Sequence, residues 1–344
     1  MSALAIYLLL GPSVTIGPFR LGAQIRLDQV GDVLGRAQPL PVLLVIACVL
    51  ASLVTRAARW QIYFLPRRRV TFGPLLGTLA ISYMASTFLP LRAGELVRAV
   101  FLGQRQAIAI PRIVGTILLE KLFDFLAIGV MLAVLVAATP SLPEAARLAG
   151  NFIAIVILAG FGFVVALAVW RDPTLKLVRS VEDHVPFGLG RRLRLEHAAG
   201  QFAEGTDSLR KPALWIPLLG WTAITWSFAF GSAWGGALAV GLQPDVSALV
   251  FLVVLTSTGQ AVPSSPGYVG VYHAAAVLAL QQFGVDPATA LGMAVLTHAL
   301  SYGSLVIVGV LALWTGGYTL GDVLAGVGAR GSSVGDPALV TTQR

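Results

Sequence analysis

Charged residues are scarce in this chain. They make up 12% of its 344 residues, against 56% that are hydrophobic, and the mean hydropathy is +0.82. A soluble domain carries about 25% charged residues, so the scarcity excludes a soluble globular protein. Several apolar runs approach the ~20 residues that a spanning helix needs. We therefore expect an integral membrane protein.

Cysteine is almost missing too. The single Cys48 lies in an apolar run, which excludes an intramolecular disulfide and a cysteine-ligated metal cluster. The H-E-x-x-H and Walker A patterns do not occur, and the sequence predicts no catalytic residues, no metal and no cofactor. The net charge of +8 does not indicate nucleic-acid binding. Its bases are spread over loops between apolar runs, where they set orientation and meet anionic lipid headgroups.

The apolar runs predict an all-α, polytopic membrane protein. We expect about seven or eight spanning helices and two re-entrant broken-helix hairpins related as an inverted repeat. The apolar runs are residues 41–65, 72–89, 113–138, 151–170, 213–240, 246–262, 268–283 and 288–314. Arg56, Arg59 and Trp60 lie near the end of the first of these runs, and we interpret them as snorkelling and interfacial-belt residues.

The transmembrane domain is predicted to cover residues 41–315. It is preceded by residues 1–40, which combine a short apolar segment (3–19) with an amphipathic, interfacial stretch (20–38). The apolar segment is a poor first span because Pro12, Gly17 and Pro18 interrupt it; a signal peptide is the alternative, without an A-x-A-like site. Residues 316–344 are rich in glycine and small residues and are predicted to be disordered.

The positive-inside rule orients the expected helices. It places residues 67–69, the loop with Arg105 and Arg112, and the polar loop 171–212 in the cytoplasm, together with both termini. The loop 171–212 has eight bases and six acids, and residues 191–209 could form a surface helix. Residues 139–150 and 241–245 then lie outside. This scheme requires residues 72–102 to enter and leave on the cytoplasmic side. The scheme places residues 20–36 outside, although they carry three Arg against two Asp, which mildly contradicts it. We expect the inner membrane of a bacterium or archaeon.

A weak internal repeat supports the hairpins. Pro90 to Gly94 and Pro263 to Gly267 share the spacing Pro-x-x-x-Gly, offset by 173 residues. Each follows an apolar run and precedes a short apolar helix and a long span, so the repeats cover residues 72–138 and 246–314. Paired, interrupted segments of this kind point to a transporter's binding site. Chance recurrence is the alternative, in a chain with 37 Gly and 19 Pro.

Within the first predicted repeat, six charged residues lie in stretches that otherwise have the composition of a membrane segment, three of each sign. An isolated charge near the bilayer centre costs about 2.5–3.5 kcal/mol, so we expect these residues to pair and to face a protein interior or an aqueous cavity. Such a cluster is by default a functional-site hypothesis. Its members are Arg92, Glu95, Arg98, Glu120, Lys121 and Asp124.

Three segments resemble signatures of one family. They are FLPLRAGELVR at residues 88–98, LEKLFD at 119–124 and PSSPGYVGVYH at 263–273. Together they resemble the flippase-like family, which includes the lysylphosphatidylglycerol synthase transmembrane region of the multiple peptide resistance factors. The resemblance covers roughly residues 41–313 and implies a polytopic, lipid-handling domain without the synthase segment. The third signature commonly ends in an acid, whereas this chain has His273, so a role for that acid does not carry over.

The cluster chemistry suits a phosphate. Arg92 and Arg98 offer guanidinium forks for a phosphodiester, and the helix starts after Gly94 and Gly267 offer backbone donors. Carboxylates on one helix face can hold these arginines or carry a proton. The alternative is a set of buried ion pairs that brace a broken helix. For Lys121 alone, snorkelling is the favoured interpretation. The predicted substrate-binding residues are Arg92, Glu95, Arg98, Glu120, Asp124, Ser264, Ser265, Tyr272 and His273. The predicted hairpin-turn residues are Pro90, Gly94, Pro263, Pro266 and Gly267, and the candidate proton relay is Glu120, Asp124 and His298.

These observations predict a protein that binds a phosphate-bearing lipid headgroup in an intramembrane cavity and translocates the lipid between leaflets. Its expected partners are a membrane phospholipid or other phosphate-bearing lipid and, as a possibility, a lipid-modifying enzyme. Two alternatives stay open: a membrane-embedded lipid-modifying transferase and a non-transporting scaffold. Tyr83 and Gln260 lie beside the predicted hairpins as further candidates for headgroup contact. His273 and His298 are lone histidines in apolar surroundings, for which a structural role is the alternative.

Overall fold

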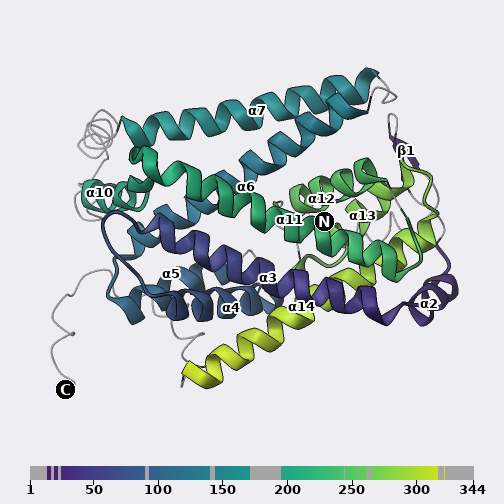
Figure 1. Cartoon of the computed structure of the whole chain (residues 1–344), viewed down its shortest axis with the longest axis horizontal. Coiled ribbons are helices and arrows are strands. Elements are labelled where there is room, and N and C mark those ends of the chain that lie inside the picture. Colours follow the sequence, from purple (N-terminus) through teal and green to yellow (C-terminus); the bar gives the residue numbers. More distant parts are fainter. Residues whose placement is uncertain are drawn as a thin grey trace, which may run out of the picture.

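Helices dominate the chain, and most run roughly along one long axis (Figure 1). The computed structural model describes residues 14–16, 19–21, 25–89, 93–139, 144–170, 195–243, 245–261, 265–316 and 321. Within these residues the strands are β1 (Val14–Ile16) and β2 (Phe19–Leu21), which pair antiparallel. This hairpin occupies part of the predicted N-terminal apolar segment, so that part is not the poor first span that we expected.

Five helices in the described residues are long and apolar enough to cross a membrane. This confirms a polytopic, essentially all-α membrane protein, whereas the predicted count of seven or eight spans is not confirmed. Three of the helices have a proline at their first or second position, where no backbone N–H is needed. The five are α3 (Pro39–Tyr63), α6 (Ile110–Ala138), α7 (Glu144–Val169), α11 (Trp215–Ala239) and α14 (Pro287–Gly316).

The other helices are shorter. Two pairs of them, α4–α5 and α12–α13, occupy the regions of the predicted hairpins, and α12 is a short apolar helix by composition. The α-helices of this group are α2 (Leu27–Gly35), α4 (Phe72–Phe88), α5 (Ala93–Gln106), α10 (Leu195–Gly205), α12 (Val246–Ala261) and α13 (Val271–Gln281). The 3-10 turns are η2 (Asp207–Arg210), η3 (Pro212–Leu214) and η4 (Pro266–Tyr268).

The first hairpin consists of α4 and α5, which pack closely and run in opposite directions. The hydroxyl of Ser82 donates to the carbonyl of Gly94 at 2.8 Å, and Arg68, just before α4, reaches the carbonyl of Ala107, just after α5, at 3.4 Å. Gly94 is required at this contact because a Cβ there would collide with the backbone oxygen of Ser82. The absence of a side chain therefore lets the two helices approach.

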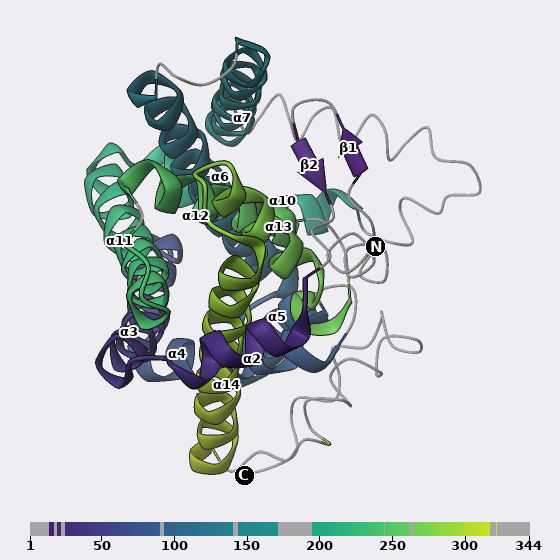
Figure 2. The same ribbon diagram turned by 90° about the vertical axis from the view of Figure 1, so that its right-hand side faces the viewer.

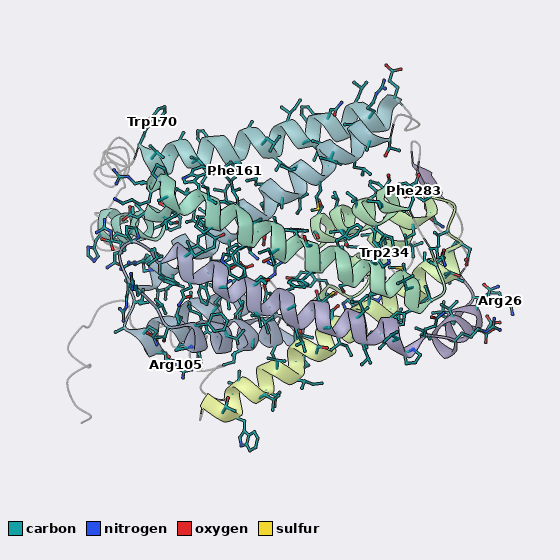
Figure 3. All side chains as sticks on the ribbon, in the orientation of Figure 1. Arg26, Arg105, Phe161, Trp170, Trp234 and Phe283 are labelled. Atoms are coloured by element: carbon teal, nitrogen blue, oxygen red, sulfur yellow. The ribbon has the colours of Figure 1, made fainter. Side chains whose placement is uncertain are left out.

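The second hairpin consists of α12, η4 and α13. Gly259 of α12 lies against α13, and Gly267 in the turn has φ +64°, a left-handed conformation that favours glycine. The base of this hairpin contains Phe283, at the opposite end of the molecule from Arg105 in the base of the first (Figure 3). The turn η4 contacts α4, and a Cβ on Gly267 would lie 3.4 Å from the carbonyl oxygen of Thr87. The hairpins thus start at opposite ends and approach each other in the interior.

The long helices surround the hairpins. Helix α3 packs along α11, α14 packs on α4, and α7 packs on α6 at one side of the molecule (Figure 2). The predicted interfacial stretch contains α2, which buries Val30 and sets Val33 against Gly292 of α14. Most of α7 faces away from the protein: its apolar window is 6% buried, as expected for a helix in contact with lipid.

The basic connections gather at one end. Arg67 Nε donates to Asp207 at 2.5 Å, and this hydrogen bond raises the pKa of the Arg67 guanidinium. Glu204 of α10 lies 4.0 Å from Arg67 and 3.9 Å from Arg112. The segments that the positive-inside rule placed on one side are therefore neighbours where they are described. Helix α10 falls within the predicted surface helix. Residues 171–194 and the predicted disordered tail, apart from Gly316 and Gly321, lie outside the described residues.

Candidate functional site

A cavity of about 360 Å³ lies between the two hairpins and the long helices. Its size is within the range of small-molecule sites in proteins. Residues from both hairpins and from α3, α6, α11 and α14 line it. The polar and charged residues among them are Ser52, Arg56, Ser82, Tyr83, Ser86, Glu95, Arg98, Glu120, Lys121, Asp124, Ser232, Thr256, Ser257, Gln260, Tyr268, Tyr272, Thr297, His298, Ser301 and Tyr302.

Arg98 and Glu120 form a buried ion pair at this cavity. Arg98 Nη2 lies 2.6 Å from Glu120 Oε2, and the two side chains are 3% and 1% exposed. The guanidinium also stacks over the ring of Trp60, 3.6 Å from its centre, a cation–π contact. Arg98 Nε has no hydrogen-bond partner within the described residues. The pair therefore holds an arginine in the protein interior with hydrogen-bonding capacity to spare.

Asp124 is the centre of a second set of contacts, one helical turn from Glu120. It accepts hydrogen bonds from Arg56 at 3.0 Å, from Arg59 at 2.8 Å and from the indole of Trp226 at 3.3 Å. Arg59 is completely buried and also donates to Thr222 of α11 at 3.1 Å. Asp124 thus ties α3 to α6 and α11, and the arginines offset its charge.

Lys121 and Glu95 make the third pair, 2.9 Å apart. Their side chains are 33% and 34% exposed, far more than those of Arg98 and Glu120. The pair links α5 to α6 at the cavity surface. Counting Arg56, Arg59, Arg98 and Lys121 against Glu95, Glu120 and Asp124, the described cluster has four cations and three anions, an excess of one positive charge.

The opposite wall of the cavity is uncharged and aromatic. His298 stacks on Tyr302 with ring centres 4.3 Å apart, and its Nε2 lies 2.7 Å from the carbonyl oxygen of Gly267. Tyr302 donates to Gln260 at 3.0 Å. The hydroxyl of Tyr272 lies 3.1 Å from that of Thr297. This wall therefore fixes the turn of the second hairpin with neutral hydrogen bonds.

The structure brings most of the predicted site residues together. Glu95, Arg98, Glu120 and Asp124 line the cavity, as do Tyr272, His298, Tyr83 and Gln260. Gly94 is the contact point of the first hairpin, and Pro266 and Gly267 form the turn of the second. Pro90, Arg92, Pro263 and Ser264 lie outside the described residues.

Two predicted residues do not line the cavity. The hydroxyl of Ser265 donates to the carbonyl of Val269 at 2.9 Å, within the turn. His273 lies beside the cavity: its Nδ1 accepts from the backbone N–H of Gly270 at 3.3 Å, and its ring centre is 4.9 Å from that of His298. Both residues support the hairpin turn instead, because the left-handed Gly267 directs the chain back on itself before α13 begins.

The interpretation of Arg56, Arg59 and Trp60 as snorkelling and belt residues was wrong. Arg59 and Trp60 are 0% exposed, and Arg56 lies on the cavity and pairs with Asp124. Lys121, for which snorkelling was the favoured interpretation, instead lines the cavity and pairs with Glu95. One signal in the sequence pointed to this: Arg56 is seven residues from the last residue of α3, about 10 Å along a helix, deeper than most interfacial residues.

The arrangement is suited to anions. Within the described residues there is no group of three or more His, Cys, Asp and Glu side chains that would hold a metal ion. Carboxylates hold the arginines, Arg59 and Arg98 each keep an Nε without a hydrogen-bond partner within the described residues, and the charge excess is positive. An anion entering the cavity would meet a prearranged set of donors.

Comparison with known proteins agrees with this description. A relative from Haloferax volcanii, named glycosyltransferase AglD, is 27% identical in an alignment 319 positions long, and the alignment covers 82% of this chain. The chain spans half of the length of that relative. The model of the lysylphosphatidylglycerol synthase transmembrane region matches residues 4–309. The protein therefore belongs to the lysylphosphatidylglycerol synthase transmembrane-region family.

Proposed function

We propose that this membrane protein binds a phosphate-bearing lipid headgroup in its cavity and moves the lipid between leaflets. One observation carries the proposal: the guanidinium of Arg98 is buried at the cavity, next to Glu120, with an unused Nε. The Nε of Arg98 can donate to a phosphodiester oxygen while Glu120 keeps its contact with Nη2, so the buried carboxylate is not left without a cation. Lys121 and Arg56, on the same cavity, add positive charge for the headgroup.

The two hairpins are the proposed route. They start at opposite ends of the molecule (Figure 3) and approach at Thr87 and Gly267. We propose that they are inverted repeats, so that movement of one against the other opens the cavity alternately to the two sides. The lipid would move down its concentration gradient, or a reaction of a partner enzyme would drive it. Its movement could instead be coupled to protons carried by Glu120, Asp124 or His298.

The proposed orientation places the end with Arg67, Arg105 and Arg112 in the cytoplasm. Glu144, the exposed first residue of α7, then faces outward. The test is labelling of Glu144→Cys in a Cys48→Ser background with an impermeant reagent. Labelling from outside supports the orientation, and labelling from inside alone reverses it.

Transport itself is tested in proteoliposomes. Arg98→Gln is expected to slow the exchange of labelled anionic phospholipid between leaflets by about 10-fold or more, since a charged hydrogen bond contributes about 1.5–3 kcal/mol. Arg105→Gln is the matched control: the same change on the same helix, at an exposed residue outside the cavity lining. Equal rates in wild type, Arg98→Gln and protein-free vesicles would contradict transport.

A second candidate is a role in lipid modification. The observation that favours it is the name of the Haloferax volcanii relative, a glycosyltransferase, of which this chain matches half. In that case the cavity would hold a lipid during its modification, by this chain or by a partner enzyme. A covalent change in labelled lipid incubated with the purified protein supports this candidate; recovery of unchanged lipid after transfer supports the first.

A further inference from the structure

The wall of the cavity built by α12, η4, α13 and α14 has no role in the phosphate site proposed above. We call it the neutral wall. Apart from His298, the candidate proton carrier named above, its polar residues are uncharged, and they place hydroxyl, amide and phenol groups on one side of the cavity. These residues are Ser257, Gln260, Tyr268, Tyr272, Ser301 and Tyr302.

The rings of the neutral wall form a connected series. The ring centres of Tyr268 and Tyr302 are 6.3 Å apart, those of Tyr302 and His298 are 4.3 Å apart, and those of His298 and Tyr272 are 5.2 Å apart. A tyrosine presents an apolar ring face and a polar hydroxyl on the same side chain. A series of such rings matches a polyol or a sugar, which presents C–H faces edged by hydroxyls.

The hydrogen bonds of this wall leave acceptors for a hydroxyl-bearing ligand. The Thr297 hydroxyl donates to the carbonyl of Met293 at 2.8 Å, so it accepts from Tyr272, whose phenol then donates across their 3.1 Å contact. The oxygen of Tyr272 keeps lone pairs that accept from a ligand hydroxyl. The hydroxyls of Ser257 and Ser301 line the same wall and both donate and accept.

The side of the cavity that carries the ion pairs, which we call the charged wall, disfavours a headgroup amine. Each of its carboxylates already meets a cation: Glu95 meets Lys121, Glu120 meets Arg98, and Asp124 meets Arg56 and Arg59. The described cluster sums to one positive charge. A headgroup that ends in an ammonium would find no carboxylate without a cation partner in the described cluster, so it would lose hydration without gaining an ion pair. A neutral hydroxyl carries no such penalty.

We propose that the neutral wall is a polyol subsite, which selects phosphate-bearing lipids whose headgroups end in uncharged hydroxyls, such as glycerol or a sugar, over those that end in an amine. The inference rests on the proposed phosphate site, which supplies the other half of the contacts. The phosphate lies at the arginines and the hydroxyls lie against the tyrosines. The proposed preference for uncharged headgroups differs from the aminoacylated lipid that the family's name mentions.

The test compares three lipids with identical acyl chains on the full-length protein in nanodiscs. Phosphatidylglycerol and phosphatidylpropanol have the same charge and similar size, and only the first has headgroup hydroxyls. Phosphatidylethanolamine adds the amine. Native mass spectrometry measures retention. We expect phosphatidylglycerol to be retained about 5-fold better than phosphatidylpropanol, the effect of about one net hydrogen bond, and better still than phosphatidylethanolamine.

Variants assign the preference to the wall. Tyr302→Phe with Ser301→Ala, and separately Ser257→Ala, should bring the ratio of phosphatidylglycerol to phosphatidylpropanol toward one. The controls remove the same groups elsewhere: Tyr63→Phe in the core and Ser227→Ala on α11, neither of which lines the cavity.

The outcomes separate the two proposals. Equal retention of phosphatidylglycerol and phosphatidylpropanol by wild type, with both weakened by Arg98→Gln, overturns the polyol subsite and leaves the phosphate site standing. Phosphatidylethanolamine retained as well as phosphatidylglycerol also overturns it, as does a ratio unchanged in both wall variants. Failure of wild type to retain either anionic lipid removes the phosphate site and, with it, the subsite.

Discussion

The two hairpins have a similar geometry and opposite chemistry. Helices α4 and α5 pair through a glycine contact, as do α12 and α13. Yet α5 carries Glu95, Arg98 and Arg105, whereas α12, η4 and α13 carry no Asp, Glu, Lys or Arg. The first hairpin is bound to α6 by ion pairs and the second to α14 by neutral hydrogen bonds. One fold element therefore serves two purposes: a place for an anion and a neutral surface opposite it.

The difference has energetic consequences. Removal of one partner from a buried ion pair leaves a charge without compensation, at a cost of about 3–5 kcal/mol. Loss of a neutral hydrogen bond costs about 0.5–1.5 kcal/mol. Substitutions in the first hairpin should therefore be the more damaging, and the predictions below follow that order.

The largest effect is expected at Arg98. Arg98→Ala leaves Glu120, which is 1% exposed, with Arg56 as its remaining cation at 3.8 Å, and should destabilise the protein by about 3–5 kcal/mol. The double variant Arg98→Ala/Glu120→Ala should regain part of that loss. Thermal unfolding in detergent measures both. A double variant with merely additive losses would show that the two residues are not coupled.

The next largest effect is expected from one member of a matched pair of glycine substitutions, one in each hairpin. Gly94→Ala places a Cβ against the backbone oxygen of Ser82 in the first hairpin and should cost about 1–3 kcal/mol, as overpacking does. In Gly259→Ala the new Cβ lies 3.4 Å from Val271 and 3.5 Å from Ala275, an ordinary contact, so the higher helix propensity of alanine should leave stability unchanged or improved. Equal thermal shifts would contradict the closer packing of the first hairpin.

Much of this site follows from the sequence, for a physical reason. Charges inside apolar runs have to pair, so Glu95, Arg98, Glu120 and Asp124 were predicted to gather, and the structure places all four on one cavity. The pairing of α4 with α5 and of α12 with α13 also follows from the lengths of the apolar runs. The glycines of Pro-x-x-x-Gly lie at the contact of the first pair and in η4 of the second.

The positions of the residues that the sequence did not predict correctly depend on tertiary packing. Whether Arg59 faces an interface or a neighbouring helix is decided by α11 and α6, far away in the sequence, and no local pattern in α3 contains that information. Ser265 was predicted at the site because it neighbours the turn, but the left-handed Gly267 redirects the chain, and Ser265 bonds within the turn. The strands β1 and β2, three residues each, are too short for an alternating pattern to be recognised.

A smaller effect is expected in the second hairpin. Tyr272→Phe removes the hydrogen bond between Tyr272 and Thr297 and should cost about 0.5–1.5 kcal/mol, because Thr297 keeps its bond to Met293. Thermal unfolding beside Arg98→Ala gives the comparison directly. A loss as large as that of Arg98→Ala would mean that the neutral wall supports the fold as strongly as the ion pairs do.

The smallest effect is expected at Lys121, although it also forms an ion pair of the first hairpin. Lys121 and Glu95 are about one-third exposed at the cavity, so water screens the pair, and Lys121→Gln should cost no more than about 1 kcal/mol. Added salt should reduce the difference between Lys121→Gln and wild type, because ions reach a solvated pair, whereas the Arg98→Ala loss should not change with salt. Thermal unfolding at low and high salt measures both. A salt-independent loss of several kcal/mol at Lys121 would show that the cavity excludes water, and the contrast between a solvated and a buried pair in the first hairpin would then be lost.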